Sequence, residues 1–240
     1  MSTALIVLAA GQGSRMKSDR PKVLHEIGGA PMFAHALASG APLDPARQVL
    51  VVGHGAGDVT RAAAELDPSV VTVVQEEQLG TGHAVAQARA ALAGFRGDAV
   101  VLYGDTPFIR PETLTRMREA RAAGHAVVIL GFEPADPGRY GRLVMQGDDL
   151  LRIVEFKDAT ETERGIRLCN SGVVCADAET LFDLLDAVGN DNASGEYYLT
   201  DIVEIARARG HTATAVTCPE AETMGINSRA DLAAAEAVFQ

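Results

Sequence analysis

The sequence predicts an α/β protein with a Rossmann-like, doubly wound and mostly parallel sheet. Through the first half of the chain, apolar runs of strand length alternate with helical patterns. Val, Ile and Leu fill these runs continuously instead of alternating with polar residues, which favours strands buried on both faces. Strand–helix–strand alternation of this kind is typical of parallel sheets covered by helices.

The expected elements of the first half follow one another in strict alternation. Strands are expected over 5–10, 48–53, 70–75, 99–103 and 126–132, and helices over 32–39, 59–66, 83–93 and 112–122. In open α/β sheets, ligands bind beyond the carboxyl ends of the strands. The residues that follow the first four strands are therefore the first candidates for a site, namely 11–15, 53–55, 75–82 and 104–105. Three of these four loops are rich in glycine.

The second half has a different rhythm. Two short extended segments, 141–145 and 150–156, flank the turn residues Gln-Gly-Asp-Asp and predict a β-hairpin. We expect a small hairpin lobe here, beside the larger sheet. The remaining expectations are a polar loop or short helix over 158–164, strands over 173–175 and 212–217, and helices over 178–188, 199–209 and 229–239, the last with Ser228 as its N-cap.

Composition and charge exclude several classes of function. The 240 residues carry a net charge of −11, which disfavours the clustered basic surface that nucleic-acid binding requires. Three widely separated cysteines indicate neither a disulfide framework nor a zinc site. The amino-terminal apolar run is too short for a signal segment, and no run is long enough to cross a membrane. We therefore expect a cytoplasmic protein with no nucleic-acid or membrane partner.

The first glycine-rich loop fits neither of two common nucleotide motifs. Met16 stands where a dinucleotide-binding G-x-G-x-x-G needs its third glycine, and no Gly-Lys-Ser/Thr ends the loop as in a Walker A motif. What is left is a turn with Arg15 inside it and Lys22 after Pro21. Small residues let backbone N–H groups approach phosphate oxygens, and both basic residues could add charge. For the bare G-x-G turn, phosphate binding and an ordinary strand–helix turn are equally open.

The complete string over 8–16, Leu-Ala-Ala-Gly-Gln-Gly-Ser-Arg-Met, followed by Pro21-Lys22, resembles the signature of the nucleotidyltransferases that activate sugar phosphates. Further segments resemble the uridyltransferase domains of the N-acetylglucosamine-1-phosphate uridyltransferase family. These segments are 75–84, 102–105, 140–142, 153–160, 170–172, 192–201 and 225–227, and they occur in the family's order over nearly the whole chain. The resemblance implies transfer of a uridylyl group from UTP to N-acetylglucosamine 1-phosphate.

The resemblance also implies which residues bind and act. Arg15 and Lys22 would be the catalytic phosphate contacts, and Asp105 and Asn227 would hold Mg²⁺ as hard oxygen ligands. Nucleotide binding would fall to Leu8, Ala9, Ala10, Gly11, Gly13, Gln75, Gly80 and Thr81. Gln75 would pair in a two-point contact with the imide edge of uracil. Sugar binding would fall to Tyr103, Gly104, Gly141, Glu155 and Asn170. Lys157 lies inside one matching segment, and the resemblance implies no role for it.

Members of this family commonly carry a second domain, a left-handed β-helix of hexapeptide repeats. Nothing in the 240 residues resembles those repeats, so we expect a single nucleotidyltransferase domain over 1–240, as a monomer or weak dimer. The chain could be a natural single-domain enzyme or a fragment. Two alternatives stay open: another sugar-phosphate nucleotidyltransferase of the same fold, and a catalytically silent nucleotide-sugar binding domain. The presence of both metal-ligand candidates and both basic residues argues against the silent domain.

Overall fold

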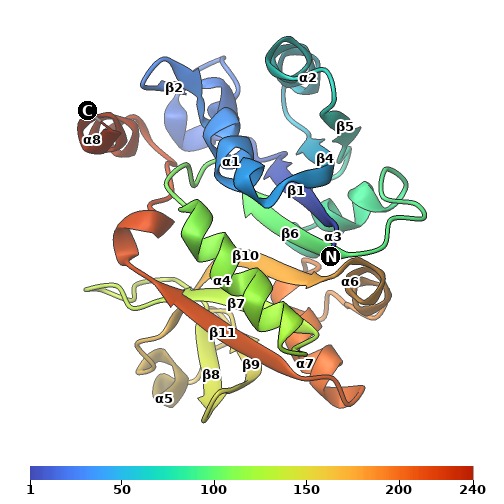
Figure 1. The fold of residues 1–240 in the computed structure, drawn as a ribbon. Helices are drawn as coiled ribbons and strands as arrows, with labels where there is room; N and C mark the ends of the chain where they lie inside the picture. Colours follow the sequence, from blue (N-terminus) through green and yellow to red (C-terminus); the bar gives the residue numbers. More distant parts are fainter. Residues whose placement is uncertain (240) are drawn as a thin grey trace.

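A mixed β-sheet forms the centre of the molecule. The computed structural model describes residues 1–239, and over these residues nine strands share one sheet, with the central order β11-β7-β10-β6-β1-β4-β5 (Figure 1). Strands β4, β5 and β6 continue the direction of β1, and β11 runs parallel to β7. Strand β10 runs antiparallel to both of its neighbours, β6 and β7. The predicted fold class is confirmed.

The element bounds are as follows. The strands are β1 Thr3–Ala9, β2 Glu26–Ile27, β3 Ala30–Pro31, β4 Pro45–Val52, β5 Val71–Val74, β6 Asp98–Tyr103, β7 Val127–Phe132, β8 Arg142–Gln146, β9 Asp149–Val154, β10 Cys169–Asp177 and β11 Ala213–Cys218. The α-helices are α1 Met32–Gly40, α2 Ala56–Leu66, α3 Thr81–Ala86, α4 Pro111–Ala122, α5 Glu161–Arg164, α6 Ala178–Leu185, α7 Ile202–Ala208 and α8 Arg229–Phe239.

Helices cover both faces of the sheet, as continuous apolar strands require. Successive residues of β1 point to opposite faces, so Ile6 joins one core cluster and Leu5 the other. The Ile6 cluster contains residues of α3, α6, α7 and the β8–β9 hairpin, and the Leu5 cluster contains residues of α1, α2 and α4. Three free cysteines are buried, as expected for structural thiols.

One consequence of the topology is decisive for the site. Because β6, β1, β4 and β5 are adjacent and parallel, the loops that follow them lie at one edge of the sheet. These are the four loops that the sequence singled out. Their convergence is confirmed by the register, which pairs Leu8 with Tyr103 and Ala9 with Val52 near the ends of their strands.

Two expectations about individual elements were wrong. Strand β5 is not buried on both faces: it is the edge strand, and Val71 and Val74 are 44% and 49% exposed. The helix expected over 83–93 ends at Ala86 and continues as a 3₁₀ turn, Gln87–Arg89. This tighter winding keeps Ala88 and Leu92 in the core, so tertiary packing overrides local helix propensity.

The β-hairpin is present, but it belongs to the main sheet. Strands β8 and β9 pair from Arg142↔Val154 to Gln146↔Asp149, and Cys169 of β10 pairs with Arg142. Strand β10 is longer than the expected 173–175. The expectation missed its first half because that part carries polar residues and glycine and pairs irregularly. The hairpin is therefore a curled extension of the sheet over the lower part of Figure 1.

A third, smaller core joins an early segment of the chain to the carboxyl-terminal helix. Ile27, Met32, Ile226 and Ala235 form an apolar cluster that seats α8 beside the β2–β3 ribbon, an element that the sequence analysis missed. The expected N-cap is confirmed, because the backbone N–H of Asp231 donates to Oγ of Ser228 at 3.2 Å. Within the described residues, no helix combines the length and the apolar composition needed to cross a membrane.

The buried ion pair between Asp98 and Arg121 joins β6 to α4 at 2.9 Å. Replacing Asp98 with Ala leaves the guanidinium buried without its partner, and we expect the free energy of unfolding to fall by about 3 kcal/mol. Urea denaturation measures the change. The matched control is Asp58→Ala, which breaks an exposed pair with Arg61 and is expected to cost less than about 1 kcal/mol. Equal losses in the two variants would contradict the assignment.

Candidate functional site

A cleft of about 320 Å³ opens at the carboxyl ends of β1, β5 and β6. Ten of the residues that the resemblance implied lie in its wall: Leu8, Ala9, Ala10, Gly11, Lys22, Gln75, Gly80, Thr81, Tyr103 and Asp105. Val23, Gln78, Ala84 and Glu196 complete the lining. Apart from Gly13, the predicted nucleotide residues therefore share one cavity, as do the expected lysine and carboxylate.

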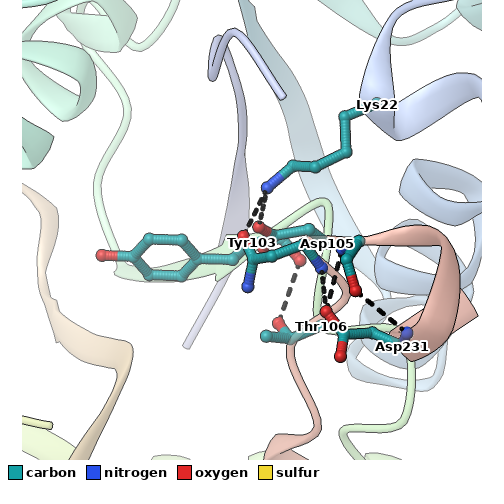
Figure 2. Close-up of polar contacts among 7 residues, drawn as sticks. Lys22, Tyr103, Asp105, Thr106 and Asp231 are labelled. Atoms are coloured by element: carbon teal, nitrogen blue, oxygen red, sulfur yellow. Dashed lines mark hydrogen bonds and ion pairs between the residues drawn. The ribbon is translucent and has the colours of Figure 1, made fainter. Parts of the chain in front are cut away.

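Lys22 is the positive centre of this cleft. Its Nζ forms an ion pair with Oδ2 of Asp105 and donates to Oδ1 of Asn227 at 3.1 Å (Figure 2). The Lys22 side chain is 10% exposed and that of Asp105 is 20% exposed, so water screens this pair only in part. Two acceptor oxygens from distant parts of the sequence thus converge on one ammonium group.

The backbone around Asp105 is held from two sides. Its carbonyl accepts from the N–H of Ile226 at 2.9 Å, and Oγ1 of Thr106 donates to the carbonyl of Tyr103 at 3.0 Å. The Ile226 bond ties the turn after β6 to the segment that leads into α8, and the Thr106 bond closes the turn itself. The carboxylate and the Asn227 amide are consequently placed by backbone contacts and do not depend on each other alone.

Asn227 owes its position to the cap of α8. Oδ2 of Asp231 accepts from the backbone N–H groups of Asn227 and Ser228, at 3.0 and 2.8 Å. Burial would raise the pKa of Asp231, but these hydrogen bonds hold the pKa below its usual value. Figure 2 places Asp231 beside the Asp105 turn. The sequence signal was available, because Ser228-x-x-Asp231 is a capping-box pattern, and only its first residue was singled out.

Glycine at position 13 makes room for the lysine. Gly13 adopts a left-handed backbone conformation, φ 62°, and a Cβ there would lie 2.6 Å from Cβ of Lys22. Gly13 therefore supports the site without lining the cleft. Arg15 is exposed in the 3₁₀ turn Ser14–Met16 and does not line the cleft either. The structure brings Lys22 to the site and leaves Arg15 at its margin.

Gln75 follows β5 and is 4% exposed, although it faces the cleft. Its Nε2 donates to the carbonyl of Gly80 at 3.1 Å and contacts Nδ1 of His83 at 3.0 Å. The amide nitrogen of Gln75 is thereby engaged within the protein. The two-point contact with uracil that the resemblance implied would require one of these bonds to be released.

The Gly80–Thr81 loop is fixed to the chain around residue 197. The N–H of Gly82 donates to the carbonyl of Tyr197 at 2.8 Å, and the N–H of Tyr197 donates to the carbonyl of Leu79 at 2.8 Å. Gly80 has a φ of 114°, and a Cβ there would lie 2.6 Å from the Tyr197 carbonyl oxygen. Oγ1 of Thr81 accepts from the N–H of Leu199 at 3.1 Å.

The predicted sugar residues form a second group. The N–H of Asn170 donates to the carbonyl of Gly141 at 2.9 Å, and a Cβ on Gly141 would lie 3.3 Å from the Glu155 carboxylate. Oγ1 of Thr200 donates to Oε1 of Glu155 at 3.2 Å. Burial raises the pKa of Glu155, the Thr200 hydroxyl opposes that shift, and the Asp201 carboxylate adds to it.

Tyr103 links the two groups. Its phenol is half-buried; desolvation raises its pKa, and the negative charges of Asp105 and Glu155 add to the shift. The ring packs on Gly172, where a Cβ would lie 2.6 Å from the ring, and Gly172 has a φ of 94°. Gly104 donates its N–H to the carbonyl of Leu8 at 2.9 Å, so it joins β6 to β1 beside the cleft.

The segment 192–200 contacts both groups of residues. Lys157, for which the resemblance implied no role, binds to this segment. Nζ of Lys157 donates to Oγ of Ser194 at 2.9 Å, and Oδ1 of Asp158 accepts from the N–H of Ala193 at 3.0 Å. The carboxyl end of the hairpin is thus fastened to the same segment that holds the Gly80–Thr81 loop. Lys157 positions that segment and does not line the cleft.

Sequence reasoning missed two further residues near the base of the cleft. The resemblance implies no role for His83, yet its Nδ1 lies 3.0 Å from the amide nitrogen of Gln75. Nε2 of Gln78 donates to the carbonyl of Ala10 at 2.6 Å, joining the loops after β5 and β1. Both lie in the resembling segment 75–84, but no spacing rule reveals a contact made across a turn.

A Glu155→Gln substitution separates binding from stability. The raised pKa of Glu155 means that the folded state disfavours its ionised form, so this group's cost appears as pH rises through the usual glutamate range and persists at neutral pH. We expect the variant to melt a few degrees higher at neutral pH, with the gain vanishing at about pH 4. Thermal unfolding at the two pH values checks this sign; a lower melting temperature at neutral pH contradicts it.

Comparison with known proteins is consistent with this geometry. The chain is 68% identical over its full length to each of two proteins named bifunctional protein GlmU, from Ruegeria sp. TM1040 and Ruegeria pomeroyi, and it spans about half of their length (53%). A UDP-glucose pyrophosphorylase complexed with UDP-glucose superposes with a TM-score of 0.76 at 16% identity, covering 100% of this chain and 98% of that one.

An inositol-1-phosphate CTP transferase from T. maritima superposes with a TM-score of 0.75 at 16% identity, covering 98% of this chain and 95% of that chain. At these identities the two structures show a shared fold. A family model for the MobA-like NTP transferase domain matches residues 5–193, which include the loops after β1, β4, β5 and β6. By this match, the chain belongs to the family of MobA-like NTP transferase domains.

Proposed function

We propose that residues 1–240 act as one nucleotidyltransferase domain that converts UTP and N-acetylglucosamine 1-phosphate to UDP-N-acetylglucosamine and pyrophosphate. Such a product is an activated sugar for cell-envelope polysaccharides. The observation that carries the proposal is the convergence of Lys22, Asp105 and Asn227 at a cleft walled by the glycine-rich loop after β1. High identity over the whole chain to the GlmU proteins supports the choice of substrates.

The proposed reaction requires no general base. The phosphate oxygen of the sugar phosphate is already ionised at neutral pH, and it attacks the α-phosphorus of UTP as pyrophosphate leaves. Catalysis then depends on holding two polyanions in line and on offsetting their charge. In a chain of net charge −11, the ammonium of Lys22 is the cation inside the cleft, and the exposed Arg15 lies beside it.

The residues fit a magnesium ion. Asp105 and Asn227 present one carboxylate oxygen and one amide oxygen to the same ammonium group, and these are the hard donors that Mg²⁺ prefers. When bound, Mg²⁺ would neutralise charge on the phosphate oxygens. With the oxygens of Asp105 and Asn227 directed to the ion, the ammonium of Lys22 would be available to donate to phosphate.

The second group of residues fits the acetamido sugar. Glu155 can accept hydrogen bonds from two hydroxyl groups, and Gly141 leaves open the space beside its carboxylate. Oδ1 of Asn170 accepts from the N–H of Gly172 at 2.9 Å, so its amide nitrogen is the group that can donate to a ligand. A sugar lacking the matching hydroxyls would leave buried polar atoms unpaired, which is the physical basis of selection.

The free cysteines bear on the cellular setting. Three buried free thiols suit a reducing compartment, so we place the enzyme in the cytoplasm. We propose that the chain of 240 residues is a monomer or weak dimer, and that its partners are small molecules.

The test is a substrate panel. UTP, CTP, dTTP and ATP are each offered with N-acetylglucosamine 1-phosphate, glucose 1-phosphate and glucosamine 1-phosphate, with and without Mg²⁺. We expect pyrophosphate release with UTP and N-acetylglucosamine 1-phosphate when Mg²⁺ is present. Turnover restricted to dTTP and glucose 1-phosphate would assign the chain to a sister activity, and no turnover with any pair would favour a silent binding domain.

Replacing Asp105 with Ala tests the proposed charge arrangement. The variant loses a metal ligand and the partner of Lys22, and we expect kcat/KM to fall by about 10³-fold. Asp105→Asn keeps a metal-binding oxygen without the charge, and its kcat/KM should fall between those of the unchanged chain and of Asp105→Ala. Thermal unfolding shows whether each variant is folded. Near-normal turnover by a folded Asp105→Ala variant would rule out this residue as a ligand.

A further inference from the structure

Arg229 joins the first turn of α8 to the loop after β1. It is the first residue of α8, two positions after Asn227. Its Nε donates to the carbonyl of Met16 at 3.0 Å, and one of its terminal nitrogens lies 3.5 Å from the carbonyl of Lys17. The forked guanidinium thus reaches two neighbouring carbonyls of a segment that lies 213 residues earlier in the chain.

These two carbonyls lie at the end of the 3₁₀ turn Ser14–Met16, which carries Arg15. The turn is closed internally by two bonds: the N–H of Met16 donates to the carbonyl of Gly13 at 2.9 Å, and the N–H of Lys17 donates to that of Ser14 at 3.3 Å. Lys17 has a φ of 49°, which is uncommon for a residue with a side chain. A turn this short has no longer ladder of hydrogen bonds, so contacts from outside determine where it lies.

The same turn is anchored on its other side by packing. Gly13 lies against Lys22, since a Cβ at position 13 would be 2.6 Å from Cβ of the lysine. The side chain of Met16 is buried, at 1% exposed. Arg15, between these two anchor points, is exposed. The backbone that carries Arg15 is therefore fixed between the lysine of the cleft and the guanidinium of Arg229.

The electrostatics of α8 place Arg15 near its first turn. Burial would raise the pKa of Asp231, the hydrogen bonds from Asn227 and Ser228 lower this pKa, and the positive charge of Arg15 lowers it further. Asp231 is in the first turn of α8, as is Arg229. Arg15 is thus close to the helix whose capping segment carries the candidate metal ligand Asn227.

We propose that Arg229 is a positioning residue that holds Arg15 where its guanidinium can contact the triphosphate of the nucleotide. The inference rests on the proposed function for the role of Arg15. An unanchored turn would have to be ordered when the nucleotide binds, and that loss of conformational entropy weakens binding. Because Arg229 and Asn227 belong to the same end of α8, one element sets the places of the marginal cation and of the candidate metal ligand.

The test replaces Arg229 with Met in the full chain, which keeps an extended side chain and removes its donors. Calorimetry with UTP and Mg²⁺, without sugar phosphate, gives the dissociation constant, and turnover gives the kinetic constants. We expect both the dissociation constant and KM for UTP to rise at least about fivefold. KM for N-acetylglucosamine 1-phosphate and the Mg²⁺ concentration for half-maximal turnover should stay unchanged. Arg229→Lys, which keeps the charge and one donor, should show a smaller loss.

A double-mutant cycle shows whether Arg229 acts through Arg15. Arg15→Ala should weaken UTP binding, and adding Arg229→Met to it should weaken binding no further, because the group being positioned is already absent. Hydrogen exchange without ligand supplies a direct readout: the amides of residues 14–17 should exchange faster in Arg229→Met. Thermal unfolding shows that each variant is folded.

The matched control is Arg209→Met. Arg209 is also exposed and also donates to a backbone carbonyl, that of Asp183 at 3.1 Å, so the substitution removes the same charge and the same kind of bond away from the cleft. It should leave UTP binding and the exchange of residues 14–17 unchanged.

The inference is overturned if Arg229→Met binds UTP as tightly as the unchanged chain, or if exchange over 14–17 does not change. Additive effects of Arg229→Met and Arg15→Ala would also overturn it, since a lost long-range charge acts in that way. A higher Mg²⁺ requirement would assign the effect to Asn227 instead. If the cycle is non-additive but the unchanged chain turns over no sugar phosphate, the proposed function fails and the role of Arg229 stands. Failure of the unchanged chain to bind UTP overturns both.

Discussion

The contact of one ammonium group with two acceptor oxygens is the interaction on which the site depends. Lys22 meets Asp105 and Asn227, which lie 83 and 205 residues further along the chain. An acidic protein that binds polyanions must concentrate positive charge locally, because its average field repels them. Lysine is also scarce, with three among 21 basic residues. A compact, flexible ammonium can donate to two oxygens in different directions, whereas the planar fork of arginine donates in fixed directions.

That interaction is maintained by elements that never touch a ligand. The capping carboxylate of Asp231 fixes Asn227, the backbone of Ile226 fixes the turn that carries Asp105, and the apolar seat of α8 fixes the capping segment in turn. Each step is a local rule of helix or turn formation. Their combination spans the chain from the loop after β1 to α8, so the site exists only when the whole domain has folded. A change that loosens α8 is therefore expected to affect the position of Asn227 as well as stability.

Sequence patterns predicted the sheet, the hairpin and the edge at which the loops meet, because buried strands and turn residues leave periodic signals. They failed where geometry depends on neighbours. Nothing in Val71–Val74 distinguishes an edge strand from a central one, since the same apolar run suits both. Motifs singled out Gln75, but the contact of His83 with its amide is made across the turn between β5 and α3. Arg15 shows the opposite case: its motif is intact, yet the structure leaves it exposed outside the cleft wall. Local sequence encodes which residues are available, and the tertiary structure decides which of them meet.

The two halves of the site are joined by one segment, and this constrains how selection can work. Residues 192–200 hold the Gly80–Thr81 loop through Tyr197 and Leu199, and they hold the end of the hairpin through Ser194. A shift of the nucleotide loop would therefore be transmitted to the hairpin by hydrogen bonds to a shared backbone. Tyr103 adds a second connection, because its ring lines the cleft, packs on Gly172 and is influenced by the charges of Asp105 and Glu155. Under the proposed function, binding of a wrong base would disturb the Gly80–Thr81 loop, which shares its anchoring segment with the hairpin. Selection of base and selection of sugar should reinforce each other, since each binding event orders part of the frame that the other requires.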